Sequence, residues 1–596
     1  MSYDALIKSK KTWFFMLFLT VMVVSIPLFS NDLIFGHDTI FHLQRIEGIK
    51  EGLLNGDFPV KLYGYVYDNY GYPAGYFYPD LFLYIPVVLG IFFPGVMAYH
   101  FFLFLITLFT AIISYVSFKS LFSHILSENK LPHYVYGAVA AMLYTGSLYR
   151  LFDLYTRAAV GEVIAMGFLP LALISFYLML KGDKNAWIGV VIGASGILEA
   201  HILSSLMLFT AYVLMSVFCY KKFVQLDVLK SVLKSAIFVI FINLWFYAPF
   251  LSMYDSFDFI IKNEVRSTAN IIIYSWTDLS KLQFWIGFFS MAVLLWYLIY
   301  SIVKSIKKQN ITHLNKVFGV CVFFCLLLIL STSPVNPWDI VANIPILGDR
   351  LSFLQSSLRL NIFTAVFIAI ALSVAICAKK NFLIFALAIA IVNLLSVTPC
   401  FEKNSFLAFH KPEEFSLSNK LPQLEGTEAD NIFLTSEDFV RNPLFFMQYS
   451  DYLNKDIPAS DYSYAYEEKT ELLNAFKSKN WPKLDPNDIT PKDAITNFSR
   501  AGLHLDFTAN ANEPTEIKLP LWFYPHSYGA TSDGEEIPVF EASHHRLAVT
   551  IPAGEHNVKV FPKLHTPYRN ACIISLFGLL AFIIWACIRA YRRKRI

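Results

Sequence analysis

The chain has 596 residues, of which 56% are hydrophobic types and only 16% are charged, and its mean hydropathy is +0.50. Soluble globular proteins carry about 25% charged residues, so this composition excludes an ordinary soluble protein. The formal net charge of +3 is too small to indicate a nucleic-acid partner.

Apolar runs of about 20 residues, the length that crosses the hydrocarbon core of a bilayer, recur along most of the sequence. They predict a polytopic α-helical membrane protein with about 12 transmembrane helices. A shorter apolar run at 81–94 is expected to be re-entrant or interfacial. The expected spans lie near 12–30, 98–117, 134–148, 160–180, 186–199, 203–219, 232–250, 284–303, 316–331, 359–377, 381–398 and 571–590.

Clusters of lysine and arginine orient the chain, because short cytoplasmic loops are enriched in positive charge. They occur at 8–11, 181–184, 221–222, 304–308, 379–380 and 592–595. This pattern predicts that both termini are cytoplasmic and that a long first loop, 31–97, lies outside. We expect a multi-pass protein of the bacterial plasma membrane.

The composition divides the chain into three parts. Residues 1–399 form the predicted transmembrane domain, and 571–596 form a C-terminal anchor with a basic tail. Between them, 400–570 is polar and is predicted to be an extracytoplasmic α+β domain, with a helix near 467–478. Its second half alternates as strands do at 516–519, 547–551 and 556–560, which predicts a β-sandwich.

The first outer loop opens with an acid in front of a helical pattern. Asp38 is typical of a helix N-cap, and the apolar residues after it predict an amphipathic helix on the membrane surface. His42 and Arg45 share one face of that helix. The alternative is a plain N-cap on an interfacial helix. The tyrosine-rich stretch that follows, 63–78, suits either a sugar platform or an interfacial aromatic belt.

The second outer loop places acids and arginines between two expected spans. Asp153 and Arg157 are four residues apart, and a simple helical ion pair is one interpretation. Glu162 enters the next span, where an ionisable residue indicates a cavity or pathway. His201 follows a further span, and Arg359 leads into another. Arg359 could instead snorkel to the interface.

All these residues fall at outer helix ends in the predicted topology. Arginine binds phosphate through a two-pronged fork, and a carboxylate beside it can deprotonate a hydroxyl group. These groups suit the transfer of a sugar from a polyprenyl phosphate. The candidate catalytic residue is Asp38, and the candidate substrate- or phosphate-binding residues are His42, Arg45, Asp153, Arg157, Glu162, His201 and Arg359.

The sequence resembles the GT-C superfamily of membrane glycosyltransferases, which includes oligosaccharyltransferase catalytic subunits, protein mannosyltransferases and aminoarabinose transferases. It is most similar to bacterial membrane proteins labelled as 6-pyruvoyl-tetrahydropterin synthase-related. The resemblance rests on short motifs spread over nearly the whole chain. These are HDTIFHLQRIEGIKEGLLNGDFP (37–59), YPDLFLYIP (78–86), FDLYTRAAVGE (152–162), EAHILSSL (199–206), LQSSLRL (354–360) and LPLWFYPHSYGATSDGEEIPVF (519–540).

The resemblance implies roles for particular residues. Asp38 matches the first-loop acid that superfamily members use at the acceptor, and Asp153 and Glu162 fall where a second-loop acidic pair occurs. Arg359 matches an arginine that follows a glutamine, aromatic, proline motif, although LQSSLR departs from that motif. No D-x-D pair stands in the second loop, so no metal ligand is assigned, and a divalent metal is an open possibility.

Two functions of different classes follow. The first is a glycosyltransferase that moves a sugar from a polyprenyl-phosphate donor to a cell-envelope glycan or polymer on the outer face of the bilayer. The second is a non-enzymatic lipid or polysaccharide transporter, or an envelope-assembly scaffold. A transporter often has an internal repeat, and the sequence shows none, which favours the enzyme.

Overall fold

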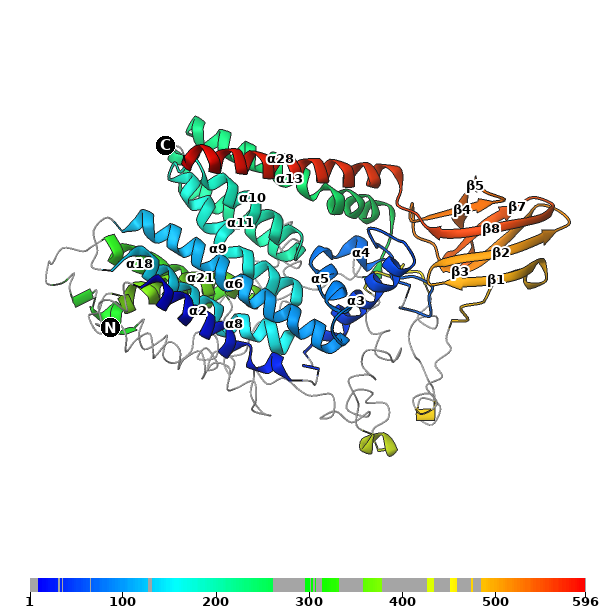
Figure 1. Cartoon of the computed structure of the whole chain (residues 1–596), viewed down its shortest axis with the longest axis horizontal. Helices are drawn as coiled ribbons and strands as arrows, with labels where there is room; N and C mark the ends of the chain where they lie inside the picture. The colour runs from blue at the N-terminus through cyan, green and yellow to red at the C-terminus, as the bar shows by residue number, and fades with distance from the viewer. Residues whose placement is uncertain are drawn as a thin grey trace. The chain divides into compact units, whose positions relative to one another are not determined.

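Figure 1 shows the computed structural model of the chain, which separates into two compact units. Unit 1 comprises residues 1–37, 99–239 and 266–410, and unit 2 comprises 38–98, 240–265 and 411–596. The structure describes residues 9–30, 33–34, 36–64, 66–126, 131–260, 295–300, 302–303, 306, 313–331, 357–377, 426–432, 451–457, 473–474, 477 and 484–594.

Unit 1 is helical. Its helices α9, α10 and α11 run alongside one another (Figure 1). Gly193 allows α10 to approach α9 closely, since a Cβ atom there would lie 2.6 Å from the backbone nitrogen of Ala172. The main helices are α2 (Lys10–Val24), α6 (Gly95–Ile125), α7 (His133–Thr145), α9 (Val160–Leu180), α10 (Ala186–Leu198), α11 (Ile202–Phe218), α13 (Leu226–Ser256), α18 (His313–Ser331) and α21 (Asn361–Cys377).

Six helices in the described part of the chain are long and apolar enough to cross a membrane: Gly95–Ile125, Val160–Leu180, Leu226–Ser256, His313–Ser331, Ser357–Cys377 and Thr566–Arg589. The count of about 12 spans is therefore not confirmed. Helices α2, α7, α10 and α11 coincide with expected spans but have only 15, 13, 13 and 17 residues. The expected span at 381–398 and most of the one at 284–303 lie outside the described residues.

The apolar run at 81–94 contains only short helices, η2 (Leu81–Leu83) and α5 (Tyr84–Leu89). At about 1.5 Å per residue, the six residues of α5 extend about 9 Å, far less than the roughly 30 Å of a hydrocarbon core. As described, this run is too short to be a full span.

Unit 2 begins with α3 (Thr39–Leu54) and α4 (Ala74–Phe77), and it contains the second half of α13 and the long α28 (Thr566–Lys594). A Cβ atom at Gly578 would lie 2.9 Å from the Cβ of Phe241, so α28 and α13 approach closely. The Ser575 hydroxyl accepts a hydrogen bond from the Trp245 backbone N–H at 2.9 Å. The C-terminal helix is therefore fixed to α13 by both packing and hydrogen bonding.

The C-terminal strands form two antiparallel sheets, in the orders β1-β2-β8-β4-β5 and β3-β7-β6. The expected strands at 516–519, 547–551 and 556–560 lie within β3, β7 and β8, which confirms the β-structure of this region. The turn at Asp533-Gly534 joins β4 to β5 with positive φ at both residues, which favours glycine. The strands are β1 (Ile495–Ala501), β2 (His504–Ala511), β3 (Thr515–Trp522), β4 (Tyr528–Ser532), β5 (Glu535–Ile537), β6 (Val539–Glu541), β7 (Arg546–Ile551) and β8 (Gly554–Pro562).

Apolar residues of β3 and β7 build much of the core of the sheets. Ile517, Leu519 and Leu521 of β3 are fully buried, as are Leu547 and Val549 of β7. The period of two expected for a strand with one buried face is kept at 516–519, but it is lost further on, because Trp522 and Ala548 are buried as well. The first half of the expected 400–570 domain, including most of the predicted helix near 467–478, lies outside the described residues.

Most of the described tyrosines in the stretch 63–78 are buried inside the protein, which fits neither an exposed sugar platform nor an interfacial belt. Tyr63, Tyr70 and Tyr72 are at most 2% exposed. The ring of Tyr70 lies 5.6 Å from that of Trp522, and the Tyr70 carbonyl accepts a hydrogen bond from the Trp522 N–H at 2.9 Å. Tyr524 is also buried and donates its hydroxyl to the Gly71 carbonyl. These aromatics therefore form a core between the loop and β3.

Helix α3 also differs from the expectation of an amphipathic helix on a surface. It begins after Asp38, as predicted, but residues on most of its faces are buried, including His42, Gln44 and Arg45. Asp38 occupies the N-cap position without a side-chain capping hydrogen bond. Helix α3 is therefore packed inside the protein along much of its length, and Lys50 and Leu54 remain exposed.

Candidate functional site

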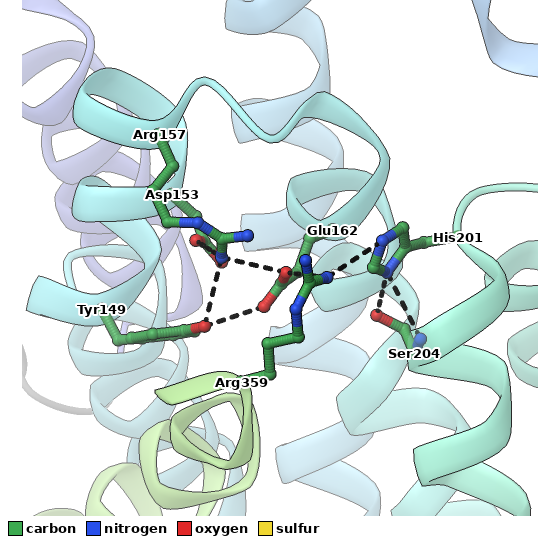
Figure 2. Close-up of polar contacts among 7 residues, drawn as sticks. All are labelled: Tyr149, Asp153, Arg157, Glu162, His201, Ser204 and Arg359. Atoms are coloured by element: carbon green, nitrogen blue, oxygen red, sulfur yellow. Dashed lines mark hydrogen bonds and ion pairs between the residues drawn. The ribbon is translucent and has the colours of Figure 1, made fainter. Parts of the chain in front are cut away.

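Charged side chains of unit 1 meet where several short elements come together (Figure 2). Tyr149 lies on α8 (Leu148–Leu151), Asp153 and Arg157 lie on the π-helix η3 (Phe152–Arg157), and Glu162 lies in the first turn of α9. His201 precedes α11, and Arg359 lies on the 3-10 helix η5 (Ser357–Leu360). We call Tyr149, Asp153, Arg157, Glu162, His201, Ser204 and Arg359 the Glu162 cluster.

The local sequence brings the loop acids to the start of α9. Ala158 adopts a left-handed conformation with φ of 52°, which ends η3, and the Ala159 N–H donates to the Asp153 carbonyl at 3.0 Å. Helix α9 then begins at Val160, so Glu162 falls in its first turn. A helix N-terminus stabilises negative charge, which favours a carboxylate at this place.

Glu162 is the centre of the cluster. Its Oε2 atom accepts hydrogen bonds from Nη1 of Arg157 at 3.0 Å and from Nη1 of Arg359 at 3.1 Å. Its Oε1 atom accepts from the Tyr149 hydroxyl at 2.8 Å. The side chain of Glu162 is fully buried, so this carboxylate depends on these partners for its charge to be tolerated.

Asp153 shares a donor with Glu162. Its Oδ1 atom accepts from Nη1 of Arg157 at 2.6 Å, the same nitrogen that bonds Glu162. Burial, and then the nearby Glu162 carboxylate, raise the pKa of Asp153 well above its usual range. The guanidinium groups of Arg157 and Arg359 therefore face two carboxyl groups, and the environment of Asp153 favours its neutral form.

His201 links the cluster to α11. Nη1 of Arg359 lies 3.2 Å from Nε2 of His201, and Nδ1 of His201 lies 2.8 Å from the Ser204 hydroxyl. Arginine can only donate, so Nε2 faces Arg359 as an acceptor, and Nδ1 accepts a hydrogen bond from the Ser204 backbone N–H at 3.3 Å. His201 therefore connects Arg359 to the first turn of α11.

Access to the cluster is from the side of the arginines. The side chains of Arg157 and Arg359 are 16% and 10% exposed, whereas those of Asp153 and Glu162 are fully buried. An incoming group would meet the guanidinium groups first. Because arginine binds anions most strongly, the group that this arrangement suits is an anion.

The structure brings together five of the residues that the sequence singled out: Asp153, Arg157, Glu162, His201 and Arg359. The Asp153–Arg157 pair at i,i+4 spacing exists, but it is one edge of a larger network. Sequence reasoning missed Tyr149 and Ser204. Tyr149 stands in a loop rich in aromatics, where no spacing marks it as the partner of Glu162.

Asp38, His42 and Arg45 belong to unit 2, and their proposed roles stay predictions. The shared face of His42 and Arg45 exists, with Nη1 of Arg45 lying 3.4 Å from Nδ1 of His42. Nη2 of Arg45 donates to the carbonyls of Pro79 at 2.5 Å and Tyr78 at 3.3 Å. Its guanidinium also lies over the Tyr78 ring at 4.3 Å. Arg45 therefore holds the segment in front of η2.

Unit 2 contains a second buried charged group that the sequence did not indicate. Lys61 and Asp80 pair at 3.7 Å, and Tyr63 donates to Asp80 at 3.3 Å. The Lys61 ammonium lies 4.5 Å from the centre of the Trp245 ring. Burial raises the pKa of Asp80, against the effects of Lys61 and Arg45. We call Arg45, Lys61, Tyr63 and Asp80 the Asp80 cluster.

Within the described ranges, no three His, Cys, Asp or Glu side chains gather closely enough to hold a metal ion.

Comparison with known protein families gives no match, and a search of curated proteins gives none either. Among solved structures, the chain is similar to Archaeoglobus fulgidus oligosaccharyltransferase in its apo form, with 12% identity and a TM-score of 0.37, over 70% of this chain and 59% of that one. It is similar to AglB from the same organism, in complex with an inhibitory peptide and a dolichol-phosphate, with 12% identity and a TM-score of 0.38, over 77% and 62%.

A third structure of the Archaeoglobus fulgidus oligosaccharyltransferase, with zinc and sulfate, gives 12% identity and a TM-score of 0.32, over 69% of this chain and 55% of that one. The chain thus spans less than two thirds of these enzymes. Likeness of this strength does not establish a shared fold or activity. The neighbours are oligosaccharyltransferases, a class named in the GT-C resemblance, whereas the 6-pyruvoyl-tetrahydropterin synthase-related label is not confirmed.

Proposed function

We propose that the protein is a membrane glycosyltransferase of the GT-C type. It would transfer a sugar from a polyprenyl-phosphate-linked donor to a cell-envelope glycan or polymer. One observation carries the proposal: Arg157 and Arg359 converge on the single buried carboxylate of Glu162. The six long apolar helices of the described chain supply the membrane setting in which a lipid-linked donor is found.

The chemistry follows from where charge develops. In the transfer, the bond between the anomeric carbon and the phosphate oxygen breaks, and a bond to the acceptor oxygen forms. Negative charge accumulates on the departing phosphate, where preorganised donors are most effective. Arg157 and Arg359 would hold this phosphate, and Glu162 and Tyr149 would keep both guanidinium groups in position.

The acceptor hydroxyl must lose a proton to a base. We propose Asp38 for this role, on the basis of the first-loop acid in the motif HDTIFHLQR. A carboxylate is a competent general base for a hydroxyl that is becoming a nucleophile. Asp38 stands at the N-cap position of α3, and the carbonyl of Asp38 accepts from the His42 N–H at 3.1 Å.

The proposed topology places the protein in the bacterial plasma membrane, with both termini in the cytoplasm. The long first loop, 31–97, and the β-sheets would lie outside, and residues 1–399, 400–570 and 571–596 would act as transmembrane domain, outer domain and anchor. The charge clusters at 8–11 and 592–595 support this orientation. A reporter enzyme that works only in the cytoplasm can be fused within 31–97. Activity of such a fusion would contradict this orientation.

The transfer reaction can be tested with the purified chain and a labelled polyprenyl-phosphate sugar. Arg359→Lys keeps the charge but loses the fork, so we expect turnover to fall by about 10–100-fold. Asp38→Asn should abolish turnover while the protein stays folded. Lys50→Ala, which alters an exposed pair with Glu47 on α3, is the matched control and should leave the rate unchanged.

Two results would contradict the proposal. Normal turnover in Asp38→Asn would remove Asp38 as the base. If the wild-type protein shows no turnover, and a strain carrying neutral residues at Asp38, Asp153 and Glu162 still complements a deletion, the protein acts as an envelope scaffold.

A further inference from the structure

A cavity of about 170 Å³ lies in unit 2, and no residue of the Glu162 cluster lines it. Its walls come from two parts of the sequence, the loop 56–62 after α3 and residues 562–564 at the end of β8, with Tyr76 and Ser527. The loop is tied to the sheet, because Nε2 of His504 on β2 lies 3.0 Å from Oδ1 of Asp57, and β2 pairs with β8.

An exposed aromatic ring marks the open side of this cavity. Phe58 lines it and is 76% exposed. The ring is braced, because it packs edge-on against Tyr84 with centroids 5.9 Å apart. Tyr84 in turn accepts a hydrogen bond from the Val60 N–H at 3.0 Å. Phe58 therefore offers a flat, supported apolar face.

The remaining walls provide both hydrogen-bond donors and acceptors. Asp57 is an acceptor, and its bond raises the pKa of His504, so the imidazole balances the carboxylate charge. Lys563 is a donor; its partner Glu536 lies 2.7 Å away in an exposed pair, which is weak and readily exchanged. Ser527 adds a buried hydroxyl. Such a mixture matches a ligand that carries many hydroxyl groups.

We propose that this cavity binds one sugar unit of a glycan. A pyranose ring has an apolar face of C–H groups, which would pack on Phe58, and hydroxyl groups at its edge, which Asp57 and Lys563 would bond. The volume is below the roughly 300–1,000 Å³ of drug-sized sites but holds about five waters at about 30 Å³ each. It therefore suits a single ring. This binding does not depend on the transfer chemistry proposed above.

The test is saturation-transfer NMR on the full-length chain in detergent, without donor lipid. The probes are the methyl glycosides of glucose, galactose, mannose and N-acetylglucosamine. We expect transfer to at least one of them. Phe58→Ala and Asp57→Asn should each weaken binding of that glycoside by about tenfold. Phe92→Ala is the matched control, because Phe92 is 74% exposed in the same unit and does not line the cavity.

Three outcomes would overturn the site. These are no saturation transfer to any of the four glycosides, equal binding in Phe58→Ala and Phe92→Ala, or a Phe58→Ala variant that loses only association with lipid vesicles. A melting curve for each variant separates loss of binding from loss of folding. Because the measurement is of binding alone, failure of the transferase assay would leave this result intact, and the reverse also holds.

Discussion

The Glu162 cluster and the Asp80 cluster both bury cationic side chains beside carboxylates, but they use them differently. In the first, Arg157 and Arg359 donate to the carboxylate of Glu162. In the second, Arg45 donates to the backbone carbonyls of Tyr78 and Pro79. A phosphate can replace or join a carboxylate on a guanidinium group, whereas a backbone carbonyl is part of the fold.

The difference teaches that burial of an arginine does not by itself indicate function. The identity of its partners is the better guide, since bonds to side-chain anions can be exchanged for a ligand. Bonds to carbonyls fix a loop, and their loss is felt as lower stability. Loss of Arg45 should therefore be seen as lower stability, and loss of Arg157 or Arg359 as weaker binding of an anion.

The largest stability effect is expected from Glu162→Gln. Removing this charge leaves Arg157 and Arg359 facing each other without their shared carboxylate, and breaking a buried ion pair costs about 3–5 kcal/mol. Denaturation by SDS in mixed micelles would measure the free energy of unfolding. A loss below about 1 kcal/mol would show that Glu162 does not hold the two arginines together.

Arg45→Met should have the next largest effect. The substitution keeps a long side chain but leaves the buried carbonyl of Pro79 without its donor, at a cost of about 1–3 kcal/mol. Lys50→Met on the same helix is the control and should change stability by about 0.5 kcal/mol or less in the same SDS assay. Equal stability of Arg45→Met and Lys50→Met would contradict the role of Arg45 in holding the segment 78–79.

Asp153→Asn should not destabilise the protein, in contrast to Glu162→Gln. Because the pKa of Asp153 is raised, the folded state keeps a proton that the unfolded state loses, so wild-type stability falls as pH rises above about 4 toward the raised pKa. A neutral asparagine does not titrate, so the variant should escape this loss and be at least as stable as the wild type at neutral pH. SDS denaturation at several pH values would measure both stabilities, and a variant much less stable than the wild type would mean that Asp153 is ionised in the folded state.

The smallest effect concerns His504 at the wall of the cavity. Asp57 raises the pKa of His504, so the pair stabilises the fold fully below about pH 6.5 and loses this effect as pH rises through the raised pKa. We expect the melting temperatures of wild type and His504→Gln to differ by the equivalent of about 0.5 kcal/mol in acid and to converge in alkali. A constant difference would contradict the pairing.

The sequence predicts the parts of the fold that follow from local pattern. The strands β3, β7 and β8 and the start of α3 are where alternation and the N-cap residue place them. The ends and lengths of the shorter apolar helices are not predicted, because hydropathy alone does not show where a helix ends. The burial of α3 and of Tyr63 to Tyr72 depends on packing against distant residues such as Trp522.

The candidate site shows the same limit. Because successive spans cross the membrane in alternate directions, the sequence predicts that Asp153, Glu162, His201 and Arg359 lie at helix ends on the same side. The structure does place these four side chains together. No rule of spacing links Arg359 to Glu162, which are 197 residues apart, or identifies Tyr149 as the donor to Glu162. The Lys61–Asp80 pair was missed because each residue stands alone in an aromatic loop.

The most direct test of the account is the affinity of the purified protein for a polyprenyl phosphate. We expect Arg157→Lys and Arg359→Lys each to weaken binding by about 10–100-fold, while Lys50→Ala at an exposed position of α3 leaves it unchanged. Equal affinities in the wild type and both cluster variants would show that the two arginines gathered at Glu162 do not receive the phosphate, and the proposed function would not stand.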